Sequence, residues 1–325
     1  MSSAAGCSQL AKCRSQFVLQ GSGSRVDLKR WFPKHMYSSL KKMQARLRSV
    51  DAVIEVHDAR IPLSGRNLSL RQNLYAIRPH LLLMNKADLV TKQLQKAAEQ
   101  KLMEQDPQLR HVFWGSMREG DSGVMQRMRD CLVEQVTSMA RYHRTEVKEY
   151  ALMVIGIPNV GKTSLINAMR RECLQKSSRA PVGDRPGVTK TVMERVKISE
   201  QPPLYVLDTP GILAPQAESL DTALKMGLCH VVFDHLIGQQ NLADYLLYWC
   251  NKRGHLQYVD ALGLRQATDD VRELLVEVAA RKGMSRRVSM PDGRITDFPD
   301  LDGAAMHFVG KFRTGELGKW MLDDL

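Results

Sequence analysis

The sequence predicts an α/β fold, with a mostly parallel sheet covered by helices on both faces, followed by a small helical domain. Short apolar runs alternate with segments of helical periodicity over the first two thirds of the chain. That pattern is typical of strands buried on both faces of a parallel sheet. After about residue 211 the short runs stop and helical spacing alone remains. A chain of 325 residues is long enough to bury two separate cores.

Five short apolar runs are the expected strands of the sheet. The helix expected before them starts near Met36, from where apolar side chains recur at helical spacing as far as Val50. Open α/β sheets bind ligands at the carboxyl ends of their strands, so the residues that follow each run form the candidate site. The expected strands are residues 52–56, 81–84, 112–114, 151–155 and 204–207.

The last third of the chain is expected to be helical. We therefore expect a sheet domain over residues 27–215 and a helical domain over residues 216–325. The segments with helical spacing are residues 218–237, 242–252, 269–282 and 304–313.

Residues 1–26 differ in composition from the rest of the chain. They contain no Asp or Glu, but they carry six serines and the basic residues Lys12, Arg14 and Arg25. This composition is typical of a mitochondrial transit peptide, and a disordered polar tail is the alternative.

The bulk composition favours some partners and disfavours others. The net charge of +12, from 47 basic and 35 acidic residues, favours polyanions such as RNA, although a basic surface suited to a basic compartment would also explain it. No apolar run approaches the roughly 18 residues of a membrane span, so the sequence predicts no transmembrane segment. The six cysteines form no CxxC pair, which argues against a zinc site and a disulfide framework.

A phosphate-binding loop is predicted at Gly156–Thr163, which has the pattern GxxxxGK[ST] between an expected strand and a helical segment. Its glycines allow backbone N–H groups to close around the phosphates. Lys162 can reach the β and γ phosphates, and the Thr163 hydroxyl can bind Mg²⁺. The residues expected to contact the nucleotide here are Asn159, Val160, Gly161, Lys162, Thr163 and Ser164.

Two further segments are expected to contact Mg²⁺ and the γ-phosphate. Asp208 begins the motif DTPG after an expected strand, so its carboxylate is a candidate Mg²⁺ holder. The backbone N–H of Gly211 in the same motif should face the γ-phosphate. In the loop-like stretch 177–191, Thr189 is the expected ligand of Mg²⁺ and the γ-phosphate, and Thr191 is the alternative.

A guanine-binding tetrapeptide, NKxD, follows the second expected strand. The Asp88 carboxylate can accept hydrogen bonds from guanine N1–H and N2–H₂, a donor pair that adenine lacks. Lys86 would lie along the base or ribose, and Asn85 would hold the loop and touch the base edge. Ser116 is either a contact to guanine O6 or an ordinary loop serine.

The order of these motifs is unusual. In Ras-like domains the phosphate loop precedes DxxG, and NKxD comes last. Here NKxD at 85–88 precedes the phosphate loop and the DTPG motif. The sequence therefore predicts a circularly permuted P-loop GTPase domain that binds GTP and Mg²⁺.

The usual water-orienting residue is missing from the predicted site. Ile212 follows DTPG where Ras-like GTPases have a glutamine, and an apolar side chain cannot orient water. Catalysis must then use another group or be slow without a partner. Asn159 could hold K⁺ near the phosphates, where a cation offsets developing negative charge, or it is simply a turn asparagine.

These motifs together resemble the YlqF/YawG family of circularly permuted ribosome-assembly GTPases, and the metazoan mitochondrial members resemble the chain most. Outside the GTP motifs, the resemblance rests on three segments and covers about residues 28–320. They are WFPKHM at 31–36, HDARIPLSGRN at 57–67 and FVGKFRTGELG at 308–318.

The resemblance implies a helical domain that contacts RNA and a role in maturing the large ribosomal subunit. For the mitochondrial members it implies the mitochondrial large subunit and its rRNA as partners, and peripheral association with the matrix side of the inner membrane. A monomer is the default expectation. The resemblance also implies that His35 assists hydrolysis, although Lys34 replaces a family glycine next to it. Helix-start packing or an RNA contact are alternatives for His35.

Two hypotheses remain for the function. The first is an assembly GTPase, slow alone and stimulated by the subunit, whose GTP form docks on the subunit and whose hydrolysis releases it. The second is a ribosome-docking protein with a structural, slowly or non-hydrolysed GTP. A metabolic kinase is disfavoured, because it would not need the guanine-reading Asp88.

Overall fold

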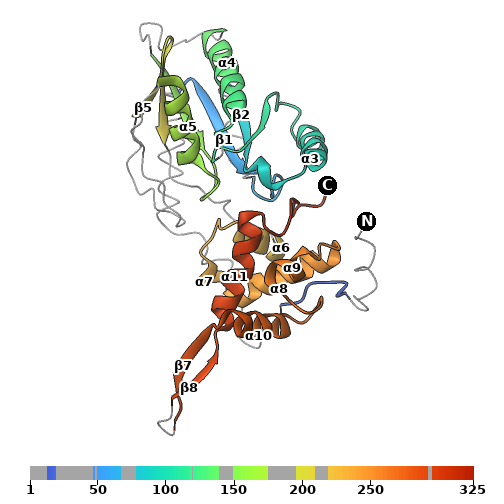
Figure 1. Cartoon of the computed structure of the whole chain (residues 1–325). Helices are drawn as coiled ribbons and strands as arrows, with labels where there is room; N and C mark the ends of the chain where they lie inside the picture. Colours follow the sequence, from blue (N-terminus) through green and yellow to red (C-terminus); the bar gives the residue numbers. More distant parts are fainter. Residues whose placement is uncertain are drawn as a thin grey trace. The chain divides into compact units, whose positions relative to one another are not determined.

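The computed structural model describes residues 13–19, 47, 50–66, 78–118, 120–138, 149–174, 195–208, 219–291 and 295–325. The chain forms two compact units (Figure 1). The sheet unit comprises Asp27–Val232 with Trp320–Leu325, and the helical unit comprises Met1–Val26 with Phe233–Lys319. In this division the sheet unit extends to residue 232, beyond the expected boundary at residue 215.

The described residues of the sheet unit form six strands in the order β3-β2-β1-β4-β6-β5. The first five in this order pair in parallel, and β5 pairs with β6 antiparallel. Each of the five expected apolar runs forms a parallel strand, whereas β5 was not expected. The strands are β1 (Ala52–Asp58), β2 (His80–Asn85), β3 (Val112–Gly115), β4 (Tyr150–Ile155), β5 (Arg195–Glu200) and β6 (Pro203–Asp208).

Apolar side chains on both faces explain why the central strands are buried. On β2, Leu82 and Met84 pack against Ala98 and Leu102 of helix α3. Leu81 and the other alternating residues of β2 point to the opposite face and are buried as well. The helices of this unit are η2 (Ala87–Leu89), α3 (Lys92–Gln105), α4 (Ser122–Ser138), α5 (Lys162–Leu174) and α6 (Leu220–Leu228).

The helical unit contains α8, α10 and α11 in mutual contact, with a two-stranded hairpin between α10 and α11. Tyr245, Tyr258 and Phe308 are among its largest fully buried side chains. The segment expected as one helix over residues 218–237 is divided, because α6 ends at Leu228 and His230 adopts a φ of 60°. The elements are α7 (Asp234–Ile237), α8 (Gln239–Lys252), α9 (Gln257–Leu262), α10 (Val271–Lys282), β7 (Ser285–Ser289), β8 (Ile295–Pro299) and α11 (Leu301–Thr314).

Residues 13–19 pack into the helical unit, within the segment expected to be a transit peptide or a disordered tail. The Arg14 guanidinium lies 2.8 Å from an Asp244 carboxylate oxygen and 3.2 Å from one of Asp269. The Phe17 ring meets the ring of Tyr245 edge-on, with centroids 5.1 Å apart. Burial raises the pKa of Asp244, and Arg14 opposes that shift. This short segment therefore contributes to the fold of the helical unit.

The last six residues of the sequence belong to the sheet unit. The backbone N–H of Leu322 donates to the Arg60 carbonyl at 2.8 Å. The Asp323 carboxylate accepts from the backbone N–H groups of Leu63 and Ser64 at 2.7 and 2.9 Å, and from the Ser64 hydroxyl. The loop after β1 is thus closed by residues from the other end of the sequence.

Candidate guanine nucleotide site

The phosphate loop joins the carboxyl end of β4 to the first turn of α5, and two of its glycines sit where no side chain fits. Gly156 has a φ of 149°, and a Cβ there would lie 2.2 Å from the Val56 carbonyl oxygen. Gly161 has a φ of 99°, and its Cβ would lie 2.2 Å from Nδ2 of Asn85. The loop therefore has its tight, glycine-dependent shape in this structure.

Lys162 is held across this loop. Its ammonium donates to the Ile157 carbonyl at 3.0 Å, and the residue is buried. Thr163 and Ser164 follow in the first turn of α5, where N–H groups without helical partners favour an anion. The arrangement places one cation and a helix amino terminus where a phosphate chain would lie.

Asn85 connects the guanine loop to two other loops. Its Nδ2 donates to the Val160 carbonyl of the phosphate loop at 2.7 Å. Its Oδ1 accepts from the backbone N–H of Met117 at 3.0 Å, in the loop after β3. The side chain is almost fully buried, with 4% of the residue exposed. Segments that are far apart in the sequence therefore meet at a single amide.

The loop with Ser116 lies beside the guanine motif because β3 pairs in parallel with β2, which sets Gly115 opposite Asn85. Ser116 is buried, and its carbonyl accepts from the Asp121 backbone N–H at 3.4 Å. This position is compatible with a contact to guanine O6, which stays a prediction.

The Asp88 carboxylate has one oxygen, Oδ1, that accepts no hydrogen bond from the described residues, although that atom is buried. Asp88 lies in the short helix η2, which follows Lys86 in the left-handed conformation with a φ of 60°. A buried carboxylate oxygen needs donors, and the N1–H and N2–H₂ groups of guanine would supply them. The residues present therefore fit guanine.

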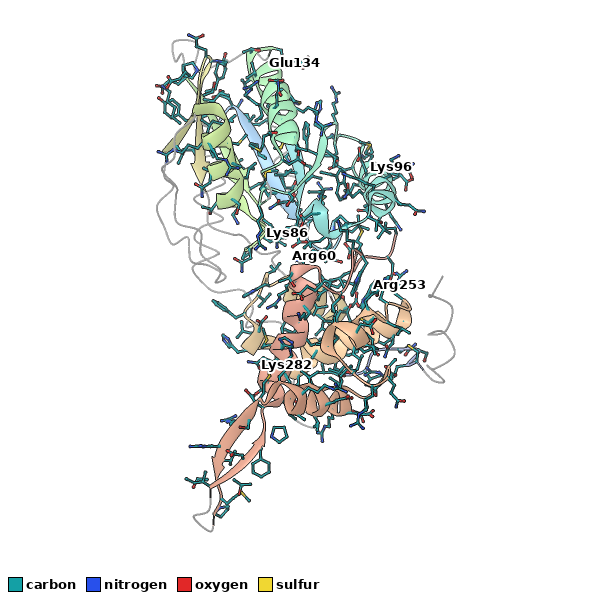
Figure 2. The ribbon with its side chains drawn as sticks, viewed as in Figure 1. Arg60, Lys86, Lys96, Glu134, Arg253 and Lys282 are labelled. Carbon is teal, nitrogen blue, oxygen red and sulfur yellow. The ribbon has the colours of Figure 1, made fainter. Side chains whose placement is uncertain are left out.

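Asp58 and Arg60 form a support for the guanine loop that the sequence motifs alone did not assign. Both carboxylate oxygens of Asp58 accept from the Arg60 guanidinium, at 2.9 and 2.8 Å. The Lys86 ammonium donates to the same carboxylate at 2.7 Å, and Figure 2 labels Arg60 and Lys86 close together. Burial alone would raise the pKa of Asp58, but the charges of Arg60 and Lys86 outweigh it and hold that pKa well below its ordinary value.

The position of Asp58 in the sequence is a signal from which this pairing with Lys86 could have been predicted. Asp58 ends the apolar strand β1, and β1 pairs directly with β2, which carries the guanine motif. A charged residue at the carboxyl end of a neighbouring parallel strand lies at the same edge of the sheet.

The relatives of this chain agree with the site. A family described as 50S ribosome-binding GTPase matches residues 151–277. Mitochondrial ribosome-associated GTPase 1 of Bos taurus is 45% identical over 316 residues, which is 96% of this chain and 92% of the relative. Ribosome biogenesis GTPase A of Bacillus cereus is 30% identical over 291 residues, which is 89% of this chain and 91% of the relative. The chain belongs to the same family of GTPases as these two relatives.

The fold is shared as well. The structure titled GNP-bound YlqF from T. maritima matches with a TM-score of 0.54 at 20% identity, covering 88% of this chain and 97% of that one. The expected P-loop GTPase fold, a mostly parallel sheet with helices, is therefore confirmed. The family match to residues 151–277 begins at β4, so the guanine motif on β2 precedes it.

The remaining expected site residues of this GTPase differ in how far the structure describes them. Asp208 ends β6 and pairs opposite Val154 of β4, so its backbone lies at the same sheet edge as the phosphate loop. Asn159 has a φ of 57°, and its Nδ2 donates to the His230 carbonyl at 2.9 Å. The other expected residues, His35, Thr189, Gly211 and Ile212, lie outside the described residues.

Proposed function

We propose that this chain is a GTP-hydrolysing assembly factor for the mitochondrial large ribosomal subunit. The GTP-bound form docks on the subunit, and hydrolysis releases it. The observation that carries the GTP part is Asn85, whose two hydrogen bonds join the guanine loop to the phosphate loop and to the loop of Met117. The names of the Bos taurus and Bacillus cereus relatives support the ribosomal and mitochondrial parts.

The nucleotide and Mg²⁺ would be held by residues from both motifs. Lys162 would bind the β and γ phosphates, and Asn85, Lys86, Asp88 and Ser116 would surround the base. Mg²⁺ would neutralise charge that develops on the phosphates during hydrolysis. Thr163, Thr189 and Asp208 are its proposed ligands, and the backbone N–H of Gly211 would face the γ-phosphate. Val160, Gly161 and Ser164 complete the proposed phosphate contacts.

Hydrolysis without a partner should be slow, since Ile212 follows DTPG and cannot orient water. His35 is one proposed source of assistance, and K⁺ held by Asn159 is another. The Asn159 amide nitrogen already donates to His230, so K⁺ would have to approach the amide oxygen.

Contact with rRNA is supported by the charge and by the hairpin of the helical unit. The chain carries a net charge of +12. Both strands of the hairpin are exposed along their whole length, and Arg286 and Arg287 lie on opposite faces of β7. Exposed arginines bind phosphates without sequence specificity, which suits docking on folded RNA.

We further propose that the protein is a monomer of the mitochondrial matrix that associates peripherally with the matrix side of the inner membrane. Within the described residues, no helix is long and apolar enough to cross a membrane.

The test is GTP turnover by the full chain, in K⁺ and in Na⁺, with and without purified mitochondrial large subunits. Lys162→Ala serves as the control for hydrolysis at this site. Strong stimulation by subunits would support the assembly role, and dependence on K⁺ would support the cation at Asn159. Turnover that ignores the subunits would contradict the proposal, and bound GTP without turnover would favour a docking protein with a structural nucleotide.

A further inference from the structure

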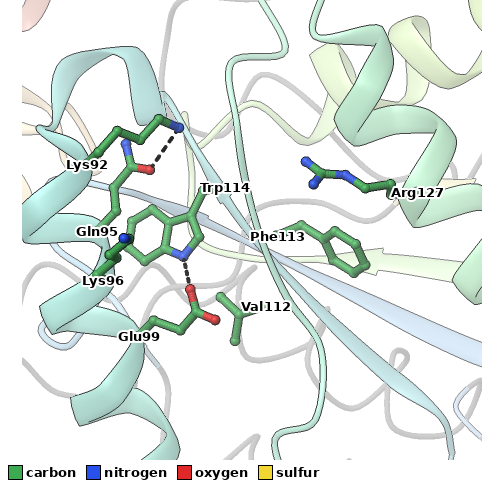
Figure 3. A pocket seen from close by; sticks show the side chains of 8 residues that line it. All are labelled: Lys92, Gln95, Lys96, Glu99, Val112, Phe113, Trp114 and Arg127. Atoms are coloured by element: carbon green, nitrogen blue, oxygen red, sulfur yellow. Dashed lines mark hydrogen bonds between the residues drawn. The ribbon is translucent and has the colours of Figure 1, made fainter.

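A cleft lies at the edge of the sheet. It is lined by residues that do not belong to the nucleotide site. Its volume is about 340 Å³. Figure 3 shows α3 on one side of it, the strand β3 in the middle and Arg127 of α4 beyond. The volume falls at the low end of sites that bind small molecules, which span roughly 300–1,000 Å³.

The position of β3 explains why this cleft is open. Among the described strands β3 pairs only with β2, so no described strand lies along its other side. Successive side chains of a strand point to opposite faces, which places Trp114 toward α3 and Phe113 toward Arg127 (Figure 3). Two aromatic rings therefore flank an open sheet edge.

The indole of Trp114 has a fixed orientation. Its Nε1 donates to a carboxylate oxygen of Glu99 at 2.9 Å. This hydrogen bond meets the need of the indole N–H. The half-buried ring packs partly against the core of the sheet unit and also lines the cleft. The hydrogen bond also engages Glu99, the one acidic side chain among the described residues that line the cleft.

Three cations surround these rings. Lys92 donates to the neutral Gln95 at 3.3 Å, and no carboxylate of the described residues pairs with it. In the described part of the chain, no carboxylate pairs with Lys96 or Arg127, and both are exposed. Three cations against one engaged carboxylate make this cleft attractive to an anion.

We propose that this cleft binds one unpaired nucleotide of single-stranded RNA. The base lies against the Trp114 indole, and the flanking phosphates contact Lys96 and Arg127. Aromatic rings beside cations are the combination that binds single strands, because every base offers a flat face and every linkage a negative charge. An acidic peptide would use the cations but would gain little from the rings. The inference rests on the proposed function, in which rRNA is the partner.

The test is binding of a labelled twelve-nucleotide oligouridine to the full chain, measured by fluorescence anisotropy at several salt concentrations. The double variant Lys96→Glu with Arg127→Glu should weaken binding at least tenfold. It should also lower the salt slope by about 1.4, the value for two lost phosphate contacts on a single strand. Lys101→Glu is the matched control, since Lys101 is on α3 but does not line the cleft, and it should bind nearly as the wild type does.

Substitutions of Trp114 test whether the base stacks on the indole ring. Trp114→Leu should weaken binding roughly 5- to 150-fold, the range for one lost base–aromatic stack, and Trp114→Phe should retain most of the affinity. A duplex of the same length should bind less well, because its bases are not available. GTP affinity, measured on each variant, should stay unchanged and so show that the sheet unit is folded.

Three outcomes would overturn the proposal. In the first, the wild type does not bind the oligouridine. In the second, the double variant binds it as well as the Lys101→Glu control does. In the third, polyglutamate displaces the oligouridine equally well from the wild type and from Trp114→Leu. The last result would identify a surface for acidic peptides. Failure of this proposal can be told apart from failure of the proposed function. If the subunits stimulate GTP turnover by the wild type while the cleft variants bind RNA normally, only the RNA cleft is contradicted. If the subunits do not stimulate GTP turnover by the wild type, the proposed function is contradicted instead.

Discussion

Replacing Asn85 by alanine should weaken GTP binding without any loss of a direct phosphate contact. The side chain donates to the Val160 carbonyl at 2.7 Å and accepts from the Met117 N–H at 3.0 Å, in a site that is 4% exposed. Asn85→Ala removes both bonds and leaves two backbone groups without their partner.

The expected magnitude follows from these two groups. A buried donor or acceptor left unsatisfied costs about 1–3 kcal/mol, so the two together cost roughly 2–6 kcal/mol, and water entering the space would lower this value. If about 2 kcal/mol of it appears in nucleotide binding, the dissociation constant for GTP rises about 30-fold. The remainder should appear as a lower free energy of unfolding of the sheet unit.

Titration calorimetry with GTP and thermal unfolding would measure the two parts. Asn85→Asp should be milder, because its carboxylate can still accept from the Met117 N–H but offers no N–H to Val160. Asn251→Ala is the matched control, since this buried amide donates to the Thr268 carbonyl at 2.9 Å within the helical unit. It should lower stability and leave GTP affinity unchanged. A GTP affinity of Asn85→Ala within threefold of the wild type would refute the reasoning.

Three other perturbations have definite expected outcomes. Asp88→Asn should lose GTP affinity and gain affinity for xanthosine triphosphate in competition assays, and unchanged preference for GTP would mean that guanine is read elsewhere. The depressed pKa of Asp58 contributes stability that is fully present above its ordinary value of 3.8 and is lost as pH falls toward the folded value. Chemical unfolding followed from pH 5 down to pH 2 should therefore show a loss of stability that Asp58→Asn reduces. Arg14→Ala should lower the free energy of unfolding of the helical unit by roughly 1–3 kcal/mol, because it leaves the carboxylates of Asp244 and Asp269 without their cation. An unchanged free energy of unfolding in a denaturant titration would show that this segment adds no stability.

The parts of the fold that could be predicted are those whose cause is local. The five parallel strands are continuous apolar runs because both of their faces are buried, so the runs were visible in the sequence. The phosphate loop was visible because Gly156, Gly161 and Lys162 have fixed spacing. These features require no knowledge of distant partners.

The missed parts depend on distant partners or lack a buried stripe. The strand β5 is an edge strand in which only Val196 and Ile198 are apolar, and the hairpin strands β7 and β8 are exposed on both faces. None of the three has a continuous apolar run. The packing of Arg14 on Asp244 and Asp269 joins residues more than 200 positions apart. The pairing of Asp58 with Lys86 follows from strand order, which the sequence does not display.

The discontinuity of both units has a consequence for chain synthesis. The sheet unit ends with Trp320–Leu325, which are made only after the whole helical unit has been synthesised. Until then the Arg60 carbonyl lacks the Leu322 N–H, and the N–H groups of Leu63 and Ser64 lack Asp323. The loop that carries Asp58 and Arg60, and with them Lys86 of the guanine motif, is therefore completed last. A nascent or prematurely stopped chain would carry every GTP motif and still lack these hydrogen bonds beside the base pocket.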